Sequence, residues 1–136
     1  MIQAGVNRFF IIWGSALAAL SVALGAFGAH SLKAVLEPDQ LQVFETGVKY
    51  QMYHSIALIL VGLIYNKISS QTIAYAGYSF MTGIVLFSGS LYLLSLKNIL
   101  GIESWKFLGP ITPLGGVGFI LGWVLLLLSV LKNKQL

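Results

Sequence analysis

Residues 112–131 read TPLGGVGFILGWVLLLLSVL, and the charge-free run around them covers 25 residues, from Phe107 to Leu131. A membrane-spanning helix needs about 20 mostly apolar residues, so this run can cross a bilayer as one helix. Thr112 can cap that helix, and Pro113 suits its first position, where the missing N–H costs nothing. Three further stretches also carry no Asp, Glu, Lys or Arg: residues 9–32, 50–66 and 68–96.

The overall composition agrees with a membrane location. Only 9% of the 136 residues are charged and 57% are hydrophobic, whereas an ordinary soluble domain carries roughly 25% charged residues. A soluble domain of this size exposes a large polar surface, which eight Lys and Arg with four Asp and Glu can hardly supply. The composition therefore excludes a soluble globular domain, a disordered tail and a nucleic-acid-binding module.

The sequence predicts one all-α domain over residues 1–136, an integral membrane four-helix bundle. Spans are expected near residues 9–29, 49–65, 73–96 and 112–131. Helix is favoured over β-barrel because runs such as Leu125–Leu128 lack the alternation of barrel strands. The first apolar run exceeds the roughly 7–15 residues of a signal-peptide core, so it is interpreted as a span.

The first long connection carries a helical pattern of its own. Leu41, Phe44 and Val48 recur at helical spacing, which predicts a short amphipathic helical segment there. Pro38 interrupts this connection and is a candidate start for a helix that continues into the second span.

Four spans place both termini and residues 66–72 at one end, and the long connections at the other. The Lys and Arg residues divide equally: Arg8, Lys67, Lys132 and Lys134 against Lys33, Lys49, Lys97 and Lys106. The four acids all fall at the long-connection end: Glu37, Asp39, Glu45 and Glu103. The ends thus carry net charges of +4 and 0. The positive-inside rule counts Lys and Arg, which are equal here, and gives acids little weight. On the net difference alone we expect a cell-membrane protein with cytoplasmic termini.

Small residues recur at helix-packing spacing in two spans. They are Gly14, Ala18, Ser21, Gly25 and Gly28 in the first span, and Gly115, Gly118 and Gly122 in the fourth. Small residues let helix backbones approach closely in lipid. Two interpretations stay open. The first is close packing within one bundle. The second is a functional groove, either a seam between copies or a substrate path.

Polar side chains gather where the spans meet the long connections. The candidate site consists of His30, Glu45, Lys49, Tyr50, Gln51, His54 and Tyr92. Imidazoles near a membrane interface can carry protons or bind a cation, and intramembrane ionisable groups are functional candidates. The alternative is that both histidines lie in the headgroup zone and satisfy helix ends or tyrosine hydroxyls.

The sequence contains no recognisable catalytic, metal or cofactor motif. Two histidines without cysteine and without HxxxH spacing are a weak metal signal. No pattern places a base beside a serine, and GPITPLGG at residues 109–116 lacks the GK[ST] of a phosphate-binding loop. We therefore expect no enzyme activity, no metal and no cofactor.

Four longer motifs occur along the chain. They are GAFGAH at residues 25–30, FETGVKYQMYHSIAL at 44–58, SGSLYLLSL at 88–96 and LGPITPLGG at 108–116. With these motifs nearly the whole chain resembles the YgdD/YwdK family of small bacterial membrane proteins, a domain of unknown function with small eukaryotic transmembrane relatives. The resemblance implies a four-span membrane protein and supplies no biochemical activity.

Two functions follow as expectations. The first is a non-enzymatic packing or interaction protein. Its expected partners are the lipid bilayer and, as an option, further copies in a homo-oligomer. No nucleic acid or known small-molecule ligand is expected. The alternative is a subunit of a small oligomeric transporter or channel that uses the polar face around His30 and His54. Four spans in 136 residues leave little room for a pore within one chain, so transport requires an oligomer.

Overall fold

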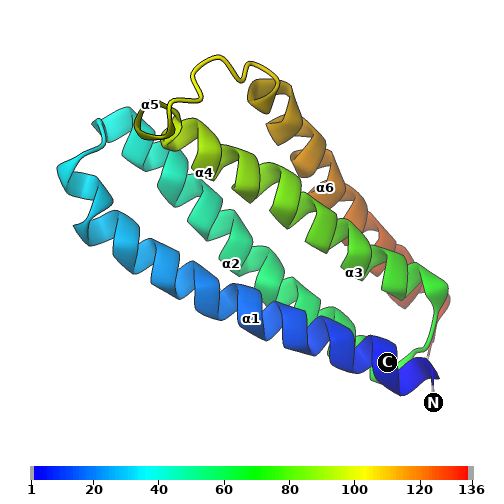
Figure 1. The fold of residues 1–136 in the computed structure, drawn as a ribbon. Coiled ribbons are helices and arrows are strands. Elements are labelled where there is room, and N and C mark those ends of the chain that lie inside the picture. Colours follow the sequence, from blue (N-terminus) through cyan, green and yellow to red (C-terminus); the bar gives the residue numbers. More distant parts are fainter. Residues whose placement is uncertain (1, 135–136) are drawn as a thin grey trace.

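Four long helical spans run antiparallel in the computed structural model, which describes residues 2–134 (Figure 1). The spans are α1 (Ile2–His30), α2 (Pro38–Lys67), a third made of α3 (Gln71–Gly83), η2 (Ile84–Ser88) and α4 (Gly89–Ser95), and α6 (Leu108–Lys132). Short helical turns, η1 (Leu32–Ala34) and α5 (Lys97–Leu100), lie in the long connections. All four spans are long and apolar enough to cross a membrane, so the predicted all-α four-span bundle is confirmed.

The second span begins earlier than the hydropathy alone suggests. Pro38 occupies the first turn of α2, and the Glu37 side chain and Gln40 Oε1 cap this end reciprocally, the latter accepting from the Glu37 N–H at 3.2 Å. Pro38 therefore opens the helix, as predicted. The amphipathic segment expected in the connection is not separate, because no helix-breaking residue follows Pro38 and α2 continues unbroken to Lys67.

The predicted start of the fourth span at Thr112 is wrong. The helix α6 begins at Leu108, Pro113 lies inside it, and Thr112 does not cap it. Pro110 falls among the first residues of α6, whose N–H groups have no intrahelical partner in any helix, so the helix can begin a turn earlier. The Thr112 hydroxyl instead lies 2.6 Å from Ser90 Oγ and joins α6 to α4.

The third span contains a wide turn that the sequence did not reveal. In η2 the N–H of Gly89 donates to the carbonyl of Ile84, five residues earlier, which is a π-helical bond. Ser88, at the end of this turn, donates to the Gly47 carbonyl of α2 at 2.7 Å. The apolar run through residues 84–87 resembles its neighbours, so periodicity gave no sign of the turn.

Helices α1 and α2 approach closely at reciprocal glycines. A Cβ at Gly14 would lie 2.8 Å from Ile59 Cγ1, and a Cβ at Gly62 would lie 2.7 Å from Ile11 Cγ1. Gly28 faces the Phe44 ring at 3.0 Å in the same way. The rest of the first small-residue series comprises Ala18, which is half-buried, Ser21, which is buried, and Gly25, which faces Val48.

The glycines of α6 face the third span. A Cβ at Gly115 would collide with the backbone nitrogen of Phe87, and one at Gly122 would lie 2.6 Å from the Phe80 ring. At Gly118 the nearest atom would be the Ser79 carbonyl oxygen at 3.3 Å. Both series of small residues thus lie against other helices of the same chain.

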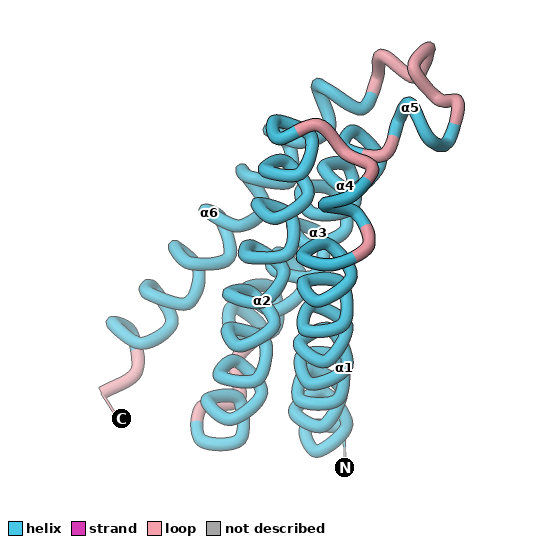
Figure 2. Tube along the Cα trace, turned by 90° about the vertical axis from the view of Figure 1, so that its left-hand side faces the viewer, coloured by secondary structure: helices cyan, strands magenta, loops and turns pink. Residues whose placement is uncertain are grey.

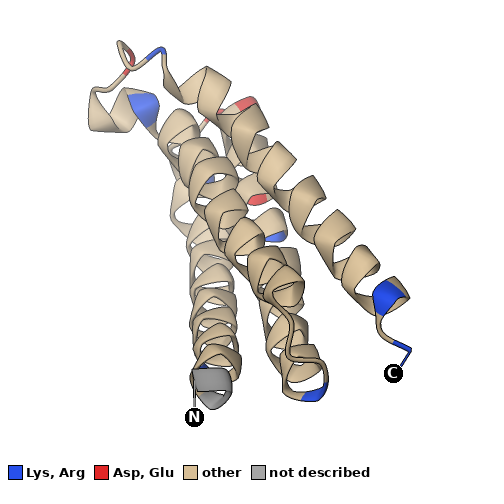
Figure 3. Cartoon of the chain, turned by 90° about the vertical axis from the view of Figure 1, so that its right-hand side faces the viewer, with Lys and Arg blue, Asp and Glu red and all other residues tan. Residues whose placement is uncertain are grey.

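The outer side of α6 is exposed, and α6 leans away from α1 and α2 towards its C-terminal end (Figure 2). Most of the charged residues lie towards the two ends of the bundle (Figure 3). The end with the termini carries only Lys and Arg, and all four acids lie towards the other end.

Candidate functional site

Gln51 is the centre of a polar cluster inside the bundle. It is 2% exposed, its Nε2 donates to the Leu17 carbonyl of α1 at 2.9 Å, and its Oε1 accepts from the Tyr92 hydroxyl of α4 at 2.6 Å. The Ser55 hydroxyl donates to the Gln51 carbonyl at 2.6 Å. We call Gln51, Ser55, Tyr92 and the Leu17 carbonyl the glutamine cluster. It links three helices through hydrogen bonds in a region shielded from water.

His54 lies on another side of α2, between α3 and α6. Its ring stacks on Phe119 with centroids 3.5 Å apart and an interplanar angle of 8°. Tyr50 stacks beside it at 6.1 Å, and Trp123 is tilted against it at 6.0 Å. We call His54, Tyr50, Phe119 and Trp123 the histidine stack.

The hydrogen bonds of His54 define its protonation state. Nδ1 lies 2.7 Å from the Tyr50 carbonyl, which can only accept, so Nδ1 carries the proton. Trp123 Nε1, which can only donate, lies 3.1 Å from His54 Nε2, so Nε2 carries none. His54 is therefore the neutral Nδ1–H tautomer, with both ring nitrogens in use.

The structure brings together four of the seven candidate residues, Tyr50, Gln51, His54 and Tyr92, in these two neighbouring groups. His30, Glu45 and Lys49 are exposed and join neither group. His30 ends α1, whereas His54 lies 16 residues beyond the start of α2, or about 24 Å along the helix. The two histidines therefore do not line one face, and His54 lies at mid-height of the bundle.

Several residues of these groups were not among the candidates. Trp123 was not a candidate, and the sequence gave no sign that it donates to His54. Ser55 could have been found from its position four residues after Gln51, where a hydroxyl reaches the carbonyl of the preceding turn. The Leu17 carbonyl could not, because the partner of a backbone atom on another helix depends on how the helices pack.

Hydrogen bonds within the chain already occupy the Gln51 amide and both ring nitrogens of His54, which limits what these groups can bind. Within residues 5–134, one buried side-chain atom, Asn7 Oδ1 of α1, has no hydrogen-bond partner. In the same part of the chain no three His, Cys, Asp or Glu side chains lie close enough to hold a metal ion. A cation at His54 Nε2 would have to displace the Trp123 N–H. The interior therefore resembles a structural polar network more than a site waiting for a ligand.

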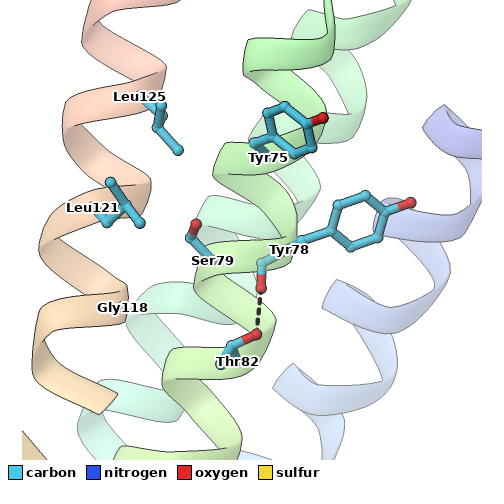
Figure 4. Close-up of a pocket in the computed structure, with 7 residues that line it drawn as sticks. All are labelled: Tyr75, Tyr78, Ser79, Thr82, Gly118, Leu121 and Leu125. Atoms are coloured by element: carbon cyan, nitrogen blue, oxygen red, sulfur yellow. Dashed lines mark hydrogen bonds between the residues drawn. The ribbon is translucent and has the colours of Figure 1, made fainter. Parts of the chain in front are cut away.

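A groove on the outside of the bundle runs between α3 and α6 (Figure 4). It has a volume of about 480 Å³, and its lining consists of Tyr75, Tyr78, Ser79, Thr82, Gly118, Leu121 and Leu125. The Thr82 hydroxyl donates back to the Tyr78 carbonyl at 2.9 Å, and Leu121 and Leu125 supply apolar surface. The groove suits an apolar occupant within the bilayer.

Known sequences resemble this chain over most of its length. The family described as "Protein of unknown function (DUF423)" matches residues 24–116, a range that contains the glutamine cluster except Leu17. The UPF0382 membrane protein YwdK of Bacillus subtilis (strain 168) is 45% identical over 126 residues, which is 92% of this chain and 98% of the relative. A UPF0382 membrane protein of Staphylococcus aureus (strain bovine RF122 / ET3-1) is 43% identical over 92% of this chain and 97% of its own. No solved structure matches at a significant level.

Proposed function

This chain belongs to the family described as proteins of unknown function (DUF423), and we propose that it works without catalysis, by associating with a second copy in the membrane. The family assignment confirms the resemblance drawn from the four motifs, and the chain is an integral membrane protein. The observation that carries the proposal is a contrast: the Gln51 amide and both His54 ring nitrogens are hydrogen-bonded within the chain, whereas α6 has an uncovered apolar face.

The saturated interior supports a packing role more than transport. Substrate or ion transport requires polar groups that exchange their partners along a path. Gln51 bonds to two other helices, and both His54 nitrogens are occupied. Moving a polar substrate past these groups would break hydrogen bonds that hold the helices together.

The outer side of α6 supports self-association. A ridge of side chains between 44% and 68% exposed runs along the helix: Val117, Ile120, Val124, Leu127 and Leu131. The α3–α6 groove lies beside it on the same helix. In a two-fold dimer the ridge of each copy can enter the groove of the other, since a symmetric interface uses the same surface twice. Helices in lipid associate through such close packing.

Single-cysteine cross-linking tests the dimer, because the chain has no cysteine of its own. Ile120→Cys, on the ridge, should give oxidant-dependent dimers in membranes on non-reducing gels. Ile12→Cys is the matched control: it is 52% exposed, lies on α1, and is 10 residues from the helix end on the termini side, against 12 for Ile120. Equal cross-linking at both positions, or none at Ile120, Val117 and Val124, would contradict the proposal. The outer side of α6 would then face lipid alone.

We also propose that the protein resides in the cell membrane with its termini in the cytoplasm. The end with the termini carries a net charge of +4 and the opposite end 0, counted from the Lys, Arg, Asp and Glu residues at each end. The negative surface of the cytoplasmic leaflet favours the basic end.

A further inference from the structure

The connection between α4 and α6 lies at the end of the bundle opposite the chain termini (Figure 1). Residues of this connection and of the adjoining ends of α4 and α6 line a small cavity. Its volume is about 230 Å³, and its lining includes Leu94, Lys97, Glu103, Trp105, Lys106 and Leu108. We propose that this cavity binds the headgroup of an anionic phospholipid, with Lys97 and Lys106 on the phosphate. The site is separate from the outer side of α6 and does not depend on self-association.

The backbone of the connection is held by its own hydrogen bonds. The Ile102 N–H donates to the Lys97 carbonyl at 2.9 Å, and the Trp105 N–H donates to the Ile102 carbonyl at 2.9 Å. Gly101 has a φ of 67°, the left-handed conformation that ends α5 and that glycine adopts most easily. The segment is therefore a folded turn that carries the two lysines at set positions.

The height of the cavity in the membrane points to lipid headgroups. The cavity lies where α4 ends, at Ser95, and where α6 begins, and spans end at the headgroup layer. The connection also exposes large apolar side chains: Ile99, Leu100, Trp105 and Phe107, between 44% and 56% exposed. Trp105 and Phe107 stack at 5.6 Å. Aromatic rings prefer this interfacial zone, so the connection is suited to lie against the bilayer.

The charges of the cavity match one phosphate. Lys97 and Lys106 contribute two positive charges and Glu103 one negative charge, which leaves a net charge of +1. A phosphatidylglycerol headgroup carries a single negative charge on its phosphate, and its hydroxyls can donate to the Glu103 carboxylate. A phosphatidylcholine headgroup has neither the net charge nor a hydroxyl to donate.

An adjoining groove accounts for the rest of the lipid. It has a volume of about 520 Å³ between α2 and α4, and it shares Leu94 and Lys97 with the cavity. Val43 and Leu91 give it apolar walls, and Asp39 is the acid in its lining. An acyl chain can follow these walls while its phosphate stays at Lys97. A free phosphate would use none of this apolar surface, so we assign the site to a phospholipid.

Native mass spectrometry of the full chain, released from mild detergent, tests the assignment. The chain is titrated separately with phosphatidylglycerol, phosphatidylethanolamine and phosphatidylcholine. Phosphatidylglycerol should bind at least about fivefold more tightly than phosphatidylcholine. A lysine near an anionic membrane surface contributes about fivefold in affinity, so Lys97→Gln and Lys106→Gln should each weaken phosphatidylglycerol binding about fivefold, and the double variant roughly 25-fold. Lys33→Gln, an exposed lysine at the same end and outside the cavity, is the matched control.

Several results would overturn the proposal. One is equal binding of phosphatidylglycerol and phosphatidylcholine to the unaltered chain, a comparison that needs no variant. Another is tighter binding of phosphatidylethanolamine, which would reject the anionic headgroup. Double-variant binding equal to that of Lys33→Gln would exclude the two lysines; if the double variant does not fold, the single variants answer the same question. Displacement of the lipid by an equal concentration of inorganic phosphate would assign the site to free phosphate.

Discussion

At the scale of single residues, the Gln51 side chain hydrogen-bonds to two other helices. One amide accepts from Tyr92 of α4 and donates to the carbonyl of Leu17 in α1. In a low-dielectric interior such groups stabilise the fold only while every member has its partner. Removing one member therefore costs more than the loss of its own hydrogen bond.

We expect Gln51→Leu to lower the free energy of unfolding by about 1–3 kcal/mol, because it leaves the Tyr92 hydroxyl buried without its acceptor. It also removes one hydrogen bond to the Leu17 carbonyl, which still accepts from the Ser21 hydroxyl. Denaturant titration in detergent micelles measures this loss. Gln42→Leu, at an exposed position of the same helix, should change stability by no more than about 0.5 kcal/mol.

The coupling between Gln51 and Tyr92 can be isolated in a double-mutant cycle. Tyr92→Phe should cost less in the Gln51→Leu background than in the unaltered chain, because the acceptor of its hydroxyl is already gone. Strictly additive losses would show that the two side chains do not act together.

At the scale of elements, the starts of α2 and α6 show how far local sequence predicts structure. The start of α2 could be predicted because Glu37, Pro38 and Gln40 form a cap within four residues. The start of α6 could not be predicted in this way, since the local sequence allows a helix to begin at either Leu108 or Thr112. The Thr112 contact with Ser90, which belongs to another helix, is part of the packing that favours the longer helix.

Adjacent glycines of α6 give a matched test of close packing. Gly115→Ala should lower the free energy of unfolding by about 1–3 kcal/mol, because its Cβ would meet the Phe87 backbone, which cannot rotate away. At Gly116 the nearest atoms to a Cβ would be ring carbons of Phe87 at 3.9 and 4.0 Å. Gly116→Ala should leave stability unchanged or raise it by up to about 1 kcal/mol, since alanine favours helix. Equal losses in denaturant titration would contradict the close approach at Gly115.

At the scale of the whole molecule, the antiparallel order of the spans places both chain ends together (Figure 1). In the orientation that we propose, the unequal charge of the two ends acts on the bundle as a whole. No single helix carries this information, because the charged residues of each end are divided among several helices and connections.

A reporter that is active only in the cytoplasm should be active when it is fused after Leu136. A second reporter, inserted between Ile102 and Glu103 in the connection that follows α5, should give the opposite result. Cytoplasmic activity of this second reporter, with the first one silent, would reverse the proposed orientation.

The class of protein, the four spans, the two ends and their charges could all be predicted from the amino-acid sequence. These follow from local properties: apolar length, proline positions and the placement of charged residues along the chain. The candidate polar residues were also visible, because a glutamine, a histidine and tyrosines near the start of an apolar run are conspicuous.

The contacts of those residues could not be predicted, because they depend on how the helices pack. Because α2 is continuous, His54 lies at mid-height of the bundle, where it contacts Trp123 and Phe119. His30 lies at the end of α1. The wide turn at Ile84–Ser88 lies where Ser88 reaches the Gly47 carbonyl. These contacts join residues 41 to 69 positions apart in the chain, so they depend on the rotation and depth of each helix against the others, which close packing sets and local sequence does not.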